Sequence, residues 1–334
     1  MAHAAVVGGG SWGTALAKVL ADKGEHVRLW ARDAAAAAAM QATRENTRYL
    51  PGVTLPSNLE VTADLRHTLH GSSLLLIVVP SHTLRDNVRA MREVGIPRGI
   101  PIMSATKGIE NETLQLMSEV LEEELPTALH GELAYLSGPS FAKEVARGQP
   151  AAVVIASRNE PLAETLQVRF SSSRLRAYAN RDVVGVEVGG ALKNVVAIAA
   201  GCVDGMGLGH NARAALITRG LAEIARVSMV KGGDPLTLAG LAGLGDLVLT
   251  CTGEASRNRT VGFELGKGRS LTDVLAGMTQ VAEGVRTAKS ARDLSLKLGV
   301  EMPITNEVYC VLYEDKPVAR AVNDLMTRTL GKEW

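Results

Sequence analysis

Cysteine is scarce in this chain and long apolar runs are missing, although 46% of its 334 residues are hydrophobic. The three cysteines, Cys202, Cys251 and Cys310, lie far apart, which suits neither a disulfide framework nor a zinc site. No uninterrupted run of about 18 apolar residues occurs, so the sequence predicts no membrane span. We therefore expect a metal-free protein of the reducing cytoplasm.

An excess of charge of either sign is also missing. Lys and Arg number 36, Asp and Glu number 35, and the formal net charge is +1. Because this balance offers no attraction for nucleic acid or for an anionic membrane, neither is an expected partner. We expect no export signal near Met1, and no repeat of fixed period is visible. The length is typical of two domains.

The first residues match the pattern G-x-G-x-x-G through Gly8, Gly10 and Gly13. A short apolar strand is expected at 4–7, a helix at 14–21 and a second strand at 26–30. In this context Gly8 makes the tight turn, Gly10 lets the backbone approach a diphosphate, and Gly13 lets the helix pack closely on the strand. The sequence therefore predicts dinucleotide binding, with a ligand-free glycine turn as the alternative.

The second strand ends at Arg32-Asp33, where the two types of nicotinamide cofactor are distinguished. An acidic residue there binds the ribose hydroxyls of NAD, whereas an arginine favours the 2′-phosphate of NADP. Arg32 lies nearer the strand end, so we expect NADPH to be preferred and NADH to be usable.

Further buried strands are expected at 73–79, 100–105, 133–136, 151–156 and 174–178, with an amphipathic helix at 113–124. This order predicts an α/β Rossmann-type domain with a mainly parallel sheet. The carboxyl ends of parallel strands meet at one edge, to which the sequence assigns Gly10, Arg32, Pro80, Lys107 and Gly138.

Three polar side chains near that edge have alternative interpretations. Lys107 either contacts an anion or is an ordinary surface lysine, and Ser140 either caps a helix or also helps to bind an anion. His82 follows a strand end and is the alternative proton donor, although a lone loop histidine is more often incidental.

Beyond about residue 185 the strand pattern gives way to helices separated by glycines, with helices expected at 212–231, 305–313 and 318–329. We therefore predict an NAD(P)-binding domain over 1–184 and an all-helical substrate and catalytic domain over 185–334.

The apolar stretch 185–201 contains Lys193 and Asn194. On a helix, the neighbours of Lys193 at three and four residues are Gly189, Gly190, Val196 and Ala197, which leaves no polar face for its ammonium. The alternative is a lysine that snorkels from the edge of a core helix. The adjacent Asn194 favours a cleft in which Lys193 donates and accepts protons, because two buried polar groups need polar partners.

Two later segments carry further polar groups. Asp246 and Thr250 are four residues apart and share a face if helical, although Asp246 alone also suits a helix cap. Ser256 is a candidate N-cap, and Arg257 beside it offers a planar fork that suits phosphate. A solvated basic turn is the alternative.

Together these segments resemble the NAD(P)-dependent glycerol-3-phosphate dehydrogenases of the bacterial biosynthetic type. The resemblance runs through 8–13, 79–82, 104–108, 136–142, 189–194, 243–246, 256–259, 278–284 and 302–305. It implies that dihydroxyacetone phosphate and sn-glycerol 3-phosphate are the substrate pair, that the product supplies phospholipid synthesis, and that Lys193 is the proton donor and acceptor.

The resemblance also assigns contacts residue by residue. Substrate contacts fall on Lys107, Gly138, Ser140, Lys193, Asp246, Ser256, Arg257 and Asn258, and cofactor contacts beyond the glycines fall on Ser11, Trp12, Arg32, Lys107, Ala142, Arg257, Val281 and Glu283. Asn194, Asp246 and Thr250 are expected to orient Lys193 or the substrate hydroxyl. We also expect a homodimer, since helical second domains of this sort often pair with a copy of themselves. The alternatives are a two-domain hydroxyacid dehydrogenase and a non-catalytic NAD(P)H sensor.

Overall fold

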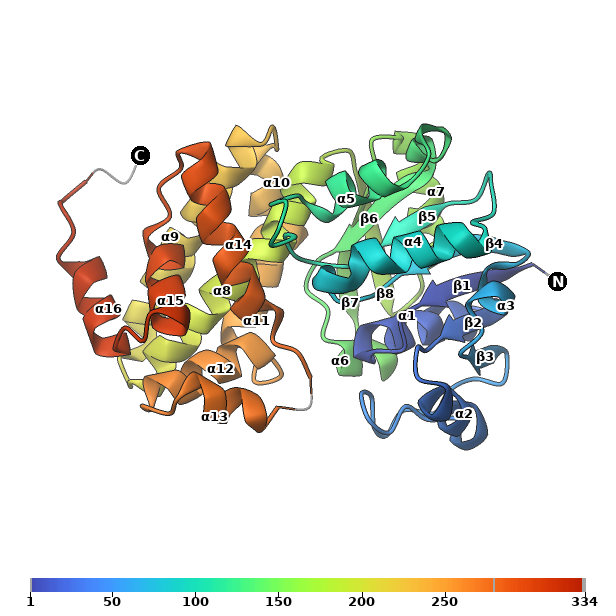
Figure 1. Cartoon of the computed structure of the whole chain (residues 1–334), viewed down its shortest axis with the longest axis horizontal. Helices are drawn as coiled ribbons and strands as arrows, with labels where there is room; N and C mark the ends of the chain where they lie inside the picture. The colour runs from blue at the N-terminus through green and yellow to red at the C-terminus, as the bar shows by residue number, and fades with distance from the viewer. Residues whose placement is uncertain (1, 279, 332–334) are drawn as a thin grey trace. The chain divides into compact units, whose positions relative to one another are not determined.

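The computed structural model describes residues 2–278 and 280–331, and the chain divides into two compact units (Figure 1). The first comprises Met1–Gly108 and Gln115–Glu187, and the second comprises Ile109–Leu114 and Val188–Trp334. The division into a domain over 1–184 and a domain over 185–334 stays a prediction. Thr279 belongs to segment 278–284, which carries part of the family resemblance, and it is not among the described residues.

The first unit is built on an eight-stranded sheet with the order β3-β2-β1-β4-β5-β6-β7-β8. All neighbouring pairs are parallel except β6 and β7. The expected Rossmann-type architecture is therefore confirmed. The strands are β1 (His3–Val7), β2 (Val27–Trp30), β3 (Leu59–Thr62), β4 (Ser72–Ile77), β5 (Ile102–Ser104), β6 (Leu133–Ser137), β7 (Ala151–Ala156) and β8 (Leu175–Asn180).

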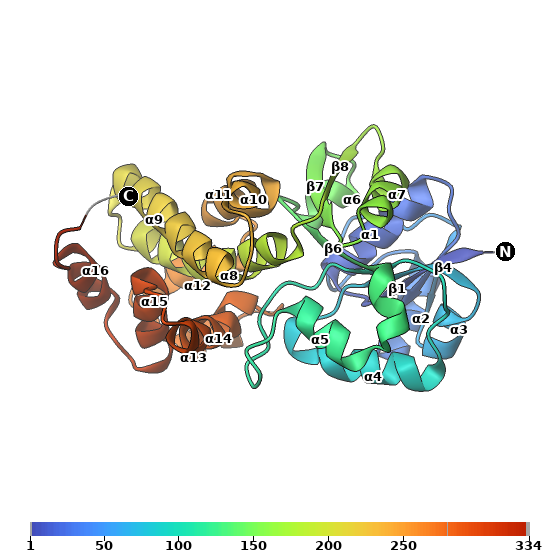
Figure 2. The same cartoon turned by 90° about the horizontal axis from the view of Figure 1, so that it is seen from above.

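Helices cover both faces of this sheet, which explains why its central strands are apolar on both sides. Figure 2 shows α1 (Ser11–Asp22), α6 (Ala142–Ala146) and α7 (Glu160–Phe170) on one side, and α3 (Leu65–Leu69), α4 (Leu84–Val94) and α5 (Met117–Glu124) on the other. The alanine-rich α2 (Ala34–Thr43) packs along β3.

Sequence reasoning missed one strand of this unit and placed the start of one helix wrongly. Strand β3 is absent from the sequence prediction, because its four residues form only a short alternating pattern. The helix predicted over 113–124 begins only at Met117, since Leu114 adopts a left-handed φ of 63° that a helix cannot contain.

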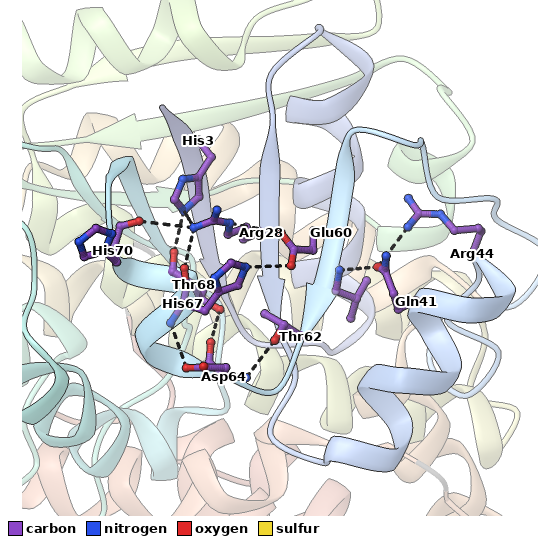
Figure 3. A network of polar contacts seen from close by, with 11 residues as sticks. His3, Arg28, Gln41, Arg44, Glu60, Thr62, Asp64, His67, Thr68 and His70 are labelled. Carbon is purple, nitrogen blue, oxygen red and sulfur yellow. Dashed lines mark hydrogen bonds and ion pairs between the residues drawn. The ribbon is translucent and has the colours of Figure 1, made fainter. Parts of the chain in front are cut away.

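A polar network lies at the amino ends of β1, β2 and β3, the edge away from the glycine turn (Figure 3). The Arg28 guanidinium donates to the carbonyl of His67 at 2.7 Å and to Glu60 Oε2 at 3.3 Å. His3 Nε2 lies 2.8 Å from the carbonyl of Thr68, and burial lowers the pKa of His3. These contacts join α3 to the first three strands.

The second unit is helical in all its described elements. These are α8 (Val183–Gly205), whose first residues belong to the first unit, α9 (Gly209–Val230), α10 (Pro235–Ala239), the π-helical turn η3 (Leu241–Gly245), α11 (Asp246–Thr252), α12 (Arg257–Gly266), α13 (Leu271–Ala276), α14 (Glu283–Leu298), α15 (Pro303–Tyr313) and α16 (Val318–Met326).

Helix α8 is long and apolar enough to cross a bilayer by length and composition alone. However, 83% of its most apolar window is buried within the structure, which is typical of a core helix. The apolar character of this stretch is explained by packing against the other helices.

Candidate active site

The glycine turn between β1 and α1 has the geometry of a nucleotide-binding turn. Gly8 has a φ of 130°, and a Cβ there would lie 2.1 Å from the carbonyl oxygen of Val78, so only glycine fits. Gly10 has an ordinary φ of −76°, and a Cβ added to it would meet nothing within 4 Å. Since neither strain nor neighbouring protein atoms require glycine at position 10, the open space in front of it suits an approaching ligand.

Helix α1 begins directly after this turn. Its N-cap Gly10 has no capping side chain, and the first amides of the helix, at Ser11 and Trp12, precede the first intrahelical hydrogen bond, from Thr14 N to Gly10 O. These amides fit a diphosphate, because they combine free donors with the positive end of the helix dipole.

Two of the predicted cofactor contacts, Trp12 and Ala142, pack against the same small cluster. That cluster consists of Ala15, Leu50, Val53 and Ala146, and it joins α1 to α6 and to the loop after α2. Trp12 and Ala142 therefore lie near each other at the starts of α1 and α6, and their contact with a cofactor stays a prediction.

Sequence reasoning missed Asn46, which holds the turn in place. Its side-chain amide is 2% exposed and donates to Gly9 O at 3.0 Å and to Thr14 Oγ1 at 2.8 Å. The sequence gives no sign of this role, since Gly9 and Thr14 lie more than 30 residues from Asn46.

At the end of β2, Asp33 and Arg32 have different surroundings. Asp33 caps α2, with Oδ1 accepting from Ala36 N at 2.9 Å. The Arg32 side chain is exposed and has no hydrogen-bond or ion-pair partner among the described residues. The acidic residue is thus engaged locally, whereas the arginine is available to an anion.

Lys107 and Ser140 meet at Gly138. Lys107 Nζ donates to the carbonyl of Gly138 at 3.3 Å, and Ser140 Oγ donates to the same carbonyl at 3.0 Å. A Cβ at Gly138 would come within 3.0 Å of Val153 Cα. These three predicted substrate contacts therefore form one group at the carboxyl edge of β5 and β6. The prediction that Ser140 caps a helix is wrong, because the N-cap of α6 is Phe141 and no side chain caps this helix.

In the second unit, Lys193 is buried in an ion pair. Lys193 is 8% exposed, and its Nζ donates to Asp246 Oδ1 at 2.5 Å and to Thr250 Oγ1 at 3.0 Å. Asp246 is 1% exposed and begins α11, and Thr250 Oγ1 also donates to the carbonyl of Asp246. The expected shared face of Asp246 and Thr250 is confirmed, and a snorkelling lysine is excluded because the ammonium is held inside the protein.

Close packing of glycines brings α11 to Lys193. The turn η3 precedes Asp246, and a Cβ at Gly189 on α8 would lie 2.6 Å from the carbonyl oxygen of Ala242 in that turn. Since Gly189 lies one helical turn before Lys193, the contact positions Asp246 against the ammonium. Such π-helical turns are frequent at functional sites.

Asn194 belongs to a second hydrogen-bonded group. Its Oδ1 accepts from Asn258 Nδ2 at 2.9 Å, and Asn258 Oδ1 accepts from the amide of Gly284 at 2.9 Å. A Cβ at Gly284 would be 2.6 Å from the carbonyl oxygen of Asn194, so the start of α14 touches α8 directly. Asn194 Nδ2 has no hydrogen-bond partner among the described residues, although the residue is only 7% exposed. This amide is a donor available to a ligand.

The start of α12 supplies the remaining polar groups. Ser256 is confirmed as an N-cap, with Oγ accepting from Arg259 N at 3.2 Å. Arg257 Nη1 donates to the carbonyl of Val281 at 3.0 Å. Arg257 is exposed as a whole, but protein atoms around its guanidinium lower its pKa while the charge of Glu283 raises it. Arginine stays charged under these conditions, so cation and helix start together suit a phosphate.

The predicted site residues thus form two groups, one in each compact unit. The first unit holds Gly8, Gly10, Ser11, Trp12, Gly13, Arg32, Lys107, Gly138, Ser140 and Ala142, and the second holds Lys193, Asn194, Asp246, Thr250, Ser256, Arg257, Asn258, Val281 and Glu283. His82, the alternative proton donor, is an exposed residue of the first unit. Within residues 2–278 and 280–331, no group of three or more His, Cys, Asp or Glu side chains could hold a metal ion.

Two family models match the chain, one in each part. Residues 3–163 match the family model of the NAD-dependent glycerol-3-phosphate dehydrogenase N-terminus, and residues 182–323 match that of the C-terminus. The glycerol-3-phosphate dehydrogenase [NAD(P)+] of Myxococcus xanthus is 55% identical over 323 residues, which cover 97% of this chain and 96% of that protein. The enzyme of the same name from Leptospira biflexa is 52% identical, with 98% of each chain covered.

A solved structure shows the same fold. The crystal structure of glycerol-3-phosphate dehydrogenase from Coxiella burnetii superposes with a TM-score of 0.93 at 44% identity, covering 98% of this chain and 99% of that one. Sequence and structure lead to the same assignment, and the chain belongs to the NAD-dependent glycerol-3-phosphate dehydrogenase family.

Proposed function

We propose that this chain catalyses the reversible reduction of dihydroxyacetone phosphate to sn-glycerol 3-phosphate with NADPH or NADH. Family membership supports the substrate pair. The observation that carries the chemistry is the buried Lys193 ammonium, held between Asp246 and Thr250. We further propose that the product supplies the glycerol phosphate backbone of phospholipids and that the reaction takes place in the cytoplasm, where the free thiols of all three cysteines are stable.

A nicotinamide cofactor, with its diphosphate held at the glycine turn before α1, would supply a hydride for the carbonyl carbon of the substrate. The protein must then stabilise and protonate the oxygen that becomes an alkoxide. Lys193 Nζ carries both a positive charge and a proton, so it meets both needs. Asp246 accepts a hydrogen bond from the ammonium and orients it, and the Thr250 hydroxyl accepts a second one.

The phosphate is assigned to the start of α12. The amides of this helix start, together with the Arg257 guanidinium, provide donors and positive charge. Asn194 Nδ2 is assigned to a substrate oxygen beside Lys193. A phosphate held by groups remote from the reacting carbon orients the carbonyl, and this positioning is a source of rate.

Asn258 has a more limited role than a full phosphate ligand. Its Oδ1 and one Nδ2 hydrogen are already engaged with Gly284 and Asn194. One hydrogen remains for a substrate oxygen, so we assign Asn258 mainly to holding Asn194 in place.

The central test is Lys193→Ala. We expect kcat for dihydroxyacetone phosphate to fall about 100- to 10,000-fold, since general acid catalysis contributes on this scale. NADPH binding, measured by fluorescence titration, should stay within a factor of two. Lys297→Ala, which changes an exposed lysine of the same unit, is the matched control and should keep the full rate.

Assays with different substrates distinguish the proposed function from the two alternative functions. Turnover of 2-keto acids in place of dihydroxyacetone phosphate would favour a hydroxyacid dehydrogenase, and tight cofactor binding without turnover would favour a sensor. A near-normal rate in Lys193→Ala would remove this residue from the chemistry.

A homodimer remains our expectation for the assembly. Exposed apolar side chains follow one another at the end of α9 and the start of α10, where Met229 is 49% exposed, Val230 56% and Leu236 77%. Light scattering on a sizing column should then give twice the 35.2 kDa mass of the chain.

A further inference from the structure

Helices α8 and α12 run in the same direction in backbone contact. Residues that are four apart on α8 contact residues that are four apart on α12, in the same order. The contacting pairs are Asn194 with Asn258, Ile198 with Gly262, and Cys202 with Gly266. A Cβ at Gly262 would lie 1.8 Å from the carbonyl oxygen of Ile198, and a Cβ at Gly266 would lie 2.5 Å from that of Cys202. The side of α12 that faces α8 therefore admits no larger residue at either position.

An ion pair joins the two helices further along α8. Asp204 Oδ2 accepts from Arg259 Nε at 2.9 Å and lies 2.7 Å from Arg259 Nη2. The side chains of Asp204 and Arg259 are only 12% and 19% exposed. A guanidinium that approaches a carboxylate with two nitrogens fixes direction as well as distance.

Asp204 has a second cationic partner besides Arg259. The role of Arg259 in positioning α12 can therefore be tested without leaving Asp204 unpaired. Arg213 Nη1 on α9 donates to both carboxylate oxygens, at 3.0 and 3.2 Å. If Arg259 is replaced, Asp204 keeps this partner, so no uncompensated carboxylate remains.

We propose that Arg259 and Asp204 are positioning residues for the phosphate-binding start of α12. The glycine contacts and the Asn194–Asn258 hydrogen bond already join the two helices. The ion pair adds a directional attachment further along α8 and limits rotation of α12 about its own axis. It thereby holds Ser256, Arg257 and Asn258 in a constant position relative to Lys193 and Asn194. This inference rests on the proposed function, because it assumes that the phosphate binds there.

The expected effect follows from the geometry of positioning. A displacement of about 1 Å at groups that orient a substrate costs up to about 100-fold in rate. A substrate without phosphate lacks the contact with Arg257 and senses the displacement only through Asn258 and Asn194, so its loss should be much smaller. Arg259→Gln should therefore reduce kcat/KM for dihydroxyacetone phosphate about 10- to 100-fold, while kcat/KM for dihydroxyacetone changes less than about threefold.

Arg269→Gln is the matched control, because Arg269, just beyond the end of α12, forms an ion pair with Glu264 of α12 at 3.1 Å. It should leave both substrates unaffected. Arg259→Lys retains the charge without the planar fork and should recover part of the loss.

A double-mutant cycle tests whether Arg259 acts through Arg257. In an Arg257→Gln background the phosphate contact is already weakened, so adding Arg259→Gln should reduce kcat/KM by less than it does in the unaltered enzyme. Additive effects would contradict the proposal.

Two other results would overturn the inference. One is an Arg259→Gln enzyme with unchanged kcat/KM for dihydroxyacetone phosphate. The other is an equal loss for both substrates, which would show a general structural role. If the unaltered enzyme reduces dihydroxyacetone phosphate and either result is found, this inference alone fails. If the unaltered enzyme does not reduce it, the proposed function has failed first, and the inference falls with it.

Discussion

Glu187 is a carboxyl group enclosed by protein near the start of α8. Its Oε1 accepts from the amide of Ser118 at 3.0 Å, and its Oε2 has no hydrogen-bond partner among the described residues. Burial raises the pKa of Glu187 to about 8, although the contacts with Ser118 lower it. The group is therefore protonated in the folded protein at neutral pH, whereas it is ionised in the unfolded chain.

This difference sets the sign of a pH dependence. The ordinary pKa of this carboxyl is 4.5. At pH values between 4.5 and about 8, Glu187 keeps its proton in the folded state and loses it in the unfolded state. The contribution of Glu187 to stability is complete below pH 4.5 and is lost as the pH rises through about 8. Glutamine cannot ionise, so Glu187→Gln should have little effect near pH 5 and should stabilise the protein by about 2–4 kcal/mol near pH 8.

Urea unfolding at both pH values measures this effect. Glu93→Gln, which changes an exposed carboxylate of α4, should give the same difference from the unaltered protein at pH 5 and pH 8. If Glu187→Gln also shows no change with pH, the buried carboxyl is not the source of the dependence.

At the scale of residues, sequence reasoning identified the groups that break a local pattern. Lys193 and Asn194 stand out because they interrupt an apolar helix, and both are buried. Arg259 and Asp204 were not identified, since charged residues at helix surfaces are ordinary and their pairing depends on how two distant helices meet. Asn46 was missed for the same reason.

Among the elements, α14 shows how a backbone contact can control chemistry. Gly284 lies in its first turn, and a Cβ there would be 2.6 Å from Asn194 O and 2.7 Å from Asn258 Oδ1. Gly284→Ala should therefore push α14 away from α8 and displace Asn194. We expect a loss of about 1–3 kcal/mol in stability and a fall in kcat of at least about 10-fold.

Thermal unfolding and steady-state kinetics measure the two effects. Gly277→Ala is the control, because the nearest atom to its added Cβ would be Val274 O at an ordinary 3.7 Å. An active, stable Gly284→Ala protein would show that α14 moves without affecting Asn194.

Element types were more predictable than their limits. Long periodic segments such as α9 were identified from the spacing of their apolar residues. The start of α5 depends on one left-handed residue, Leu114, for which the sequence gives no warning. The antiparallel pairing of β7 with β6 was also not predictable, because apolar strands look alike in either direction.

For the molecule as a whole, cofactor binding should appear as added stability. A ligand at 100 times its Kd stabilises the folded state by about 2.7 kcal/mol. With Arg32 exposed and Asp33 engaged as the cap of α2, we expect NADPH to raise the melting temperature more than NADH does at equal concentration. Arg32→Ala should remove this difference while leaving the response to NADH intact.

Arg48→Ala changes another arginine of the first unit and should retain the larger response to NADPH. A persistent preference for NADPH in Arg32→Ala would mean that some other group recognises the 2′-phosphate.

The parallel alignment of α8 and α12 makes the length of α8 as constrained as its composition. The segment between Asn194 and Asp204 separates two attachments to one partner helix. One inserted or deleted residue there would turn these side chains relative to each other by about 100°. Homologous chains should therefore exchange small apolar residues within this segment but carry insertions and deletions only outside it.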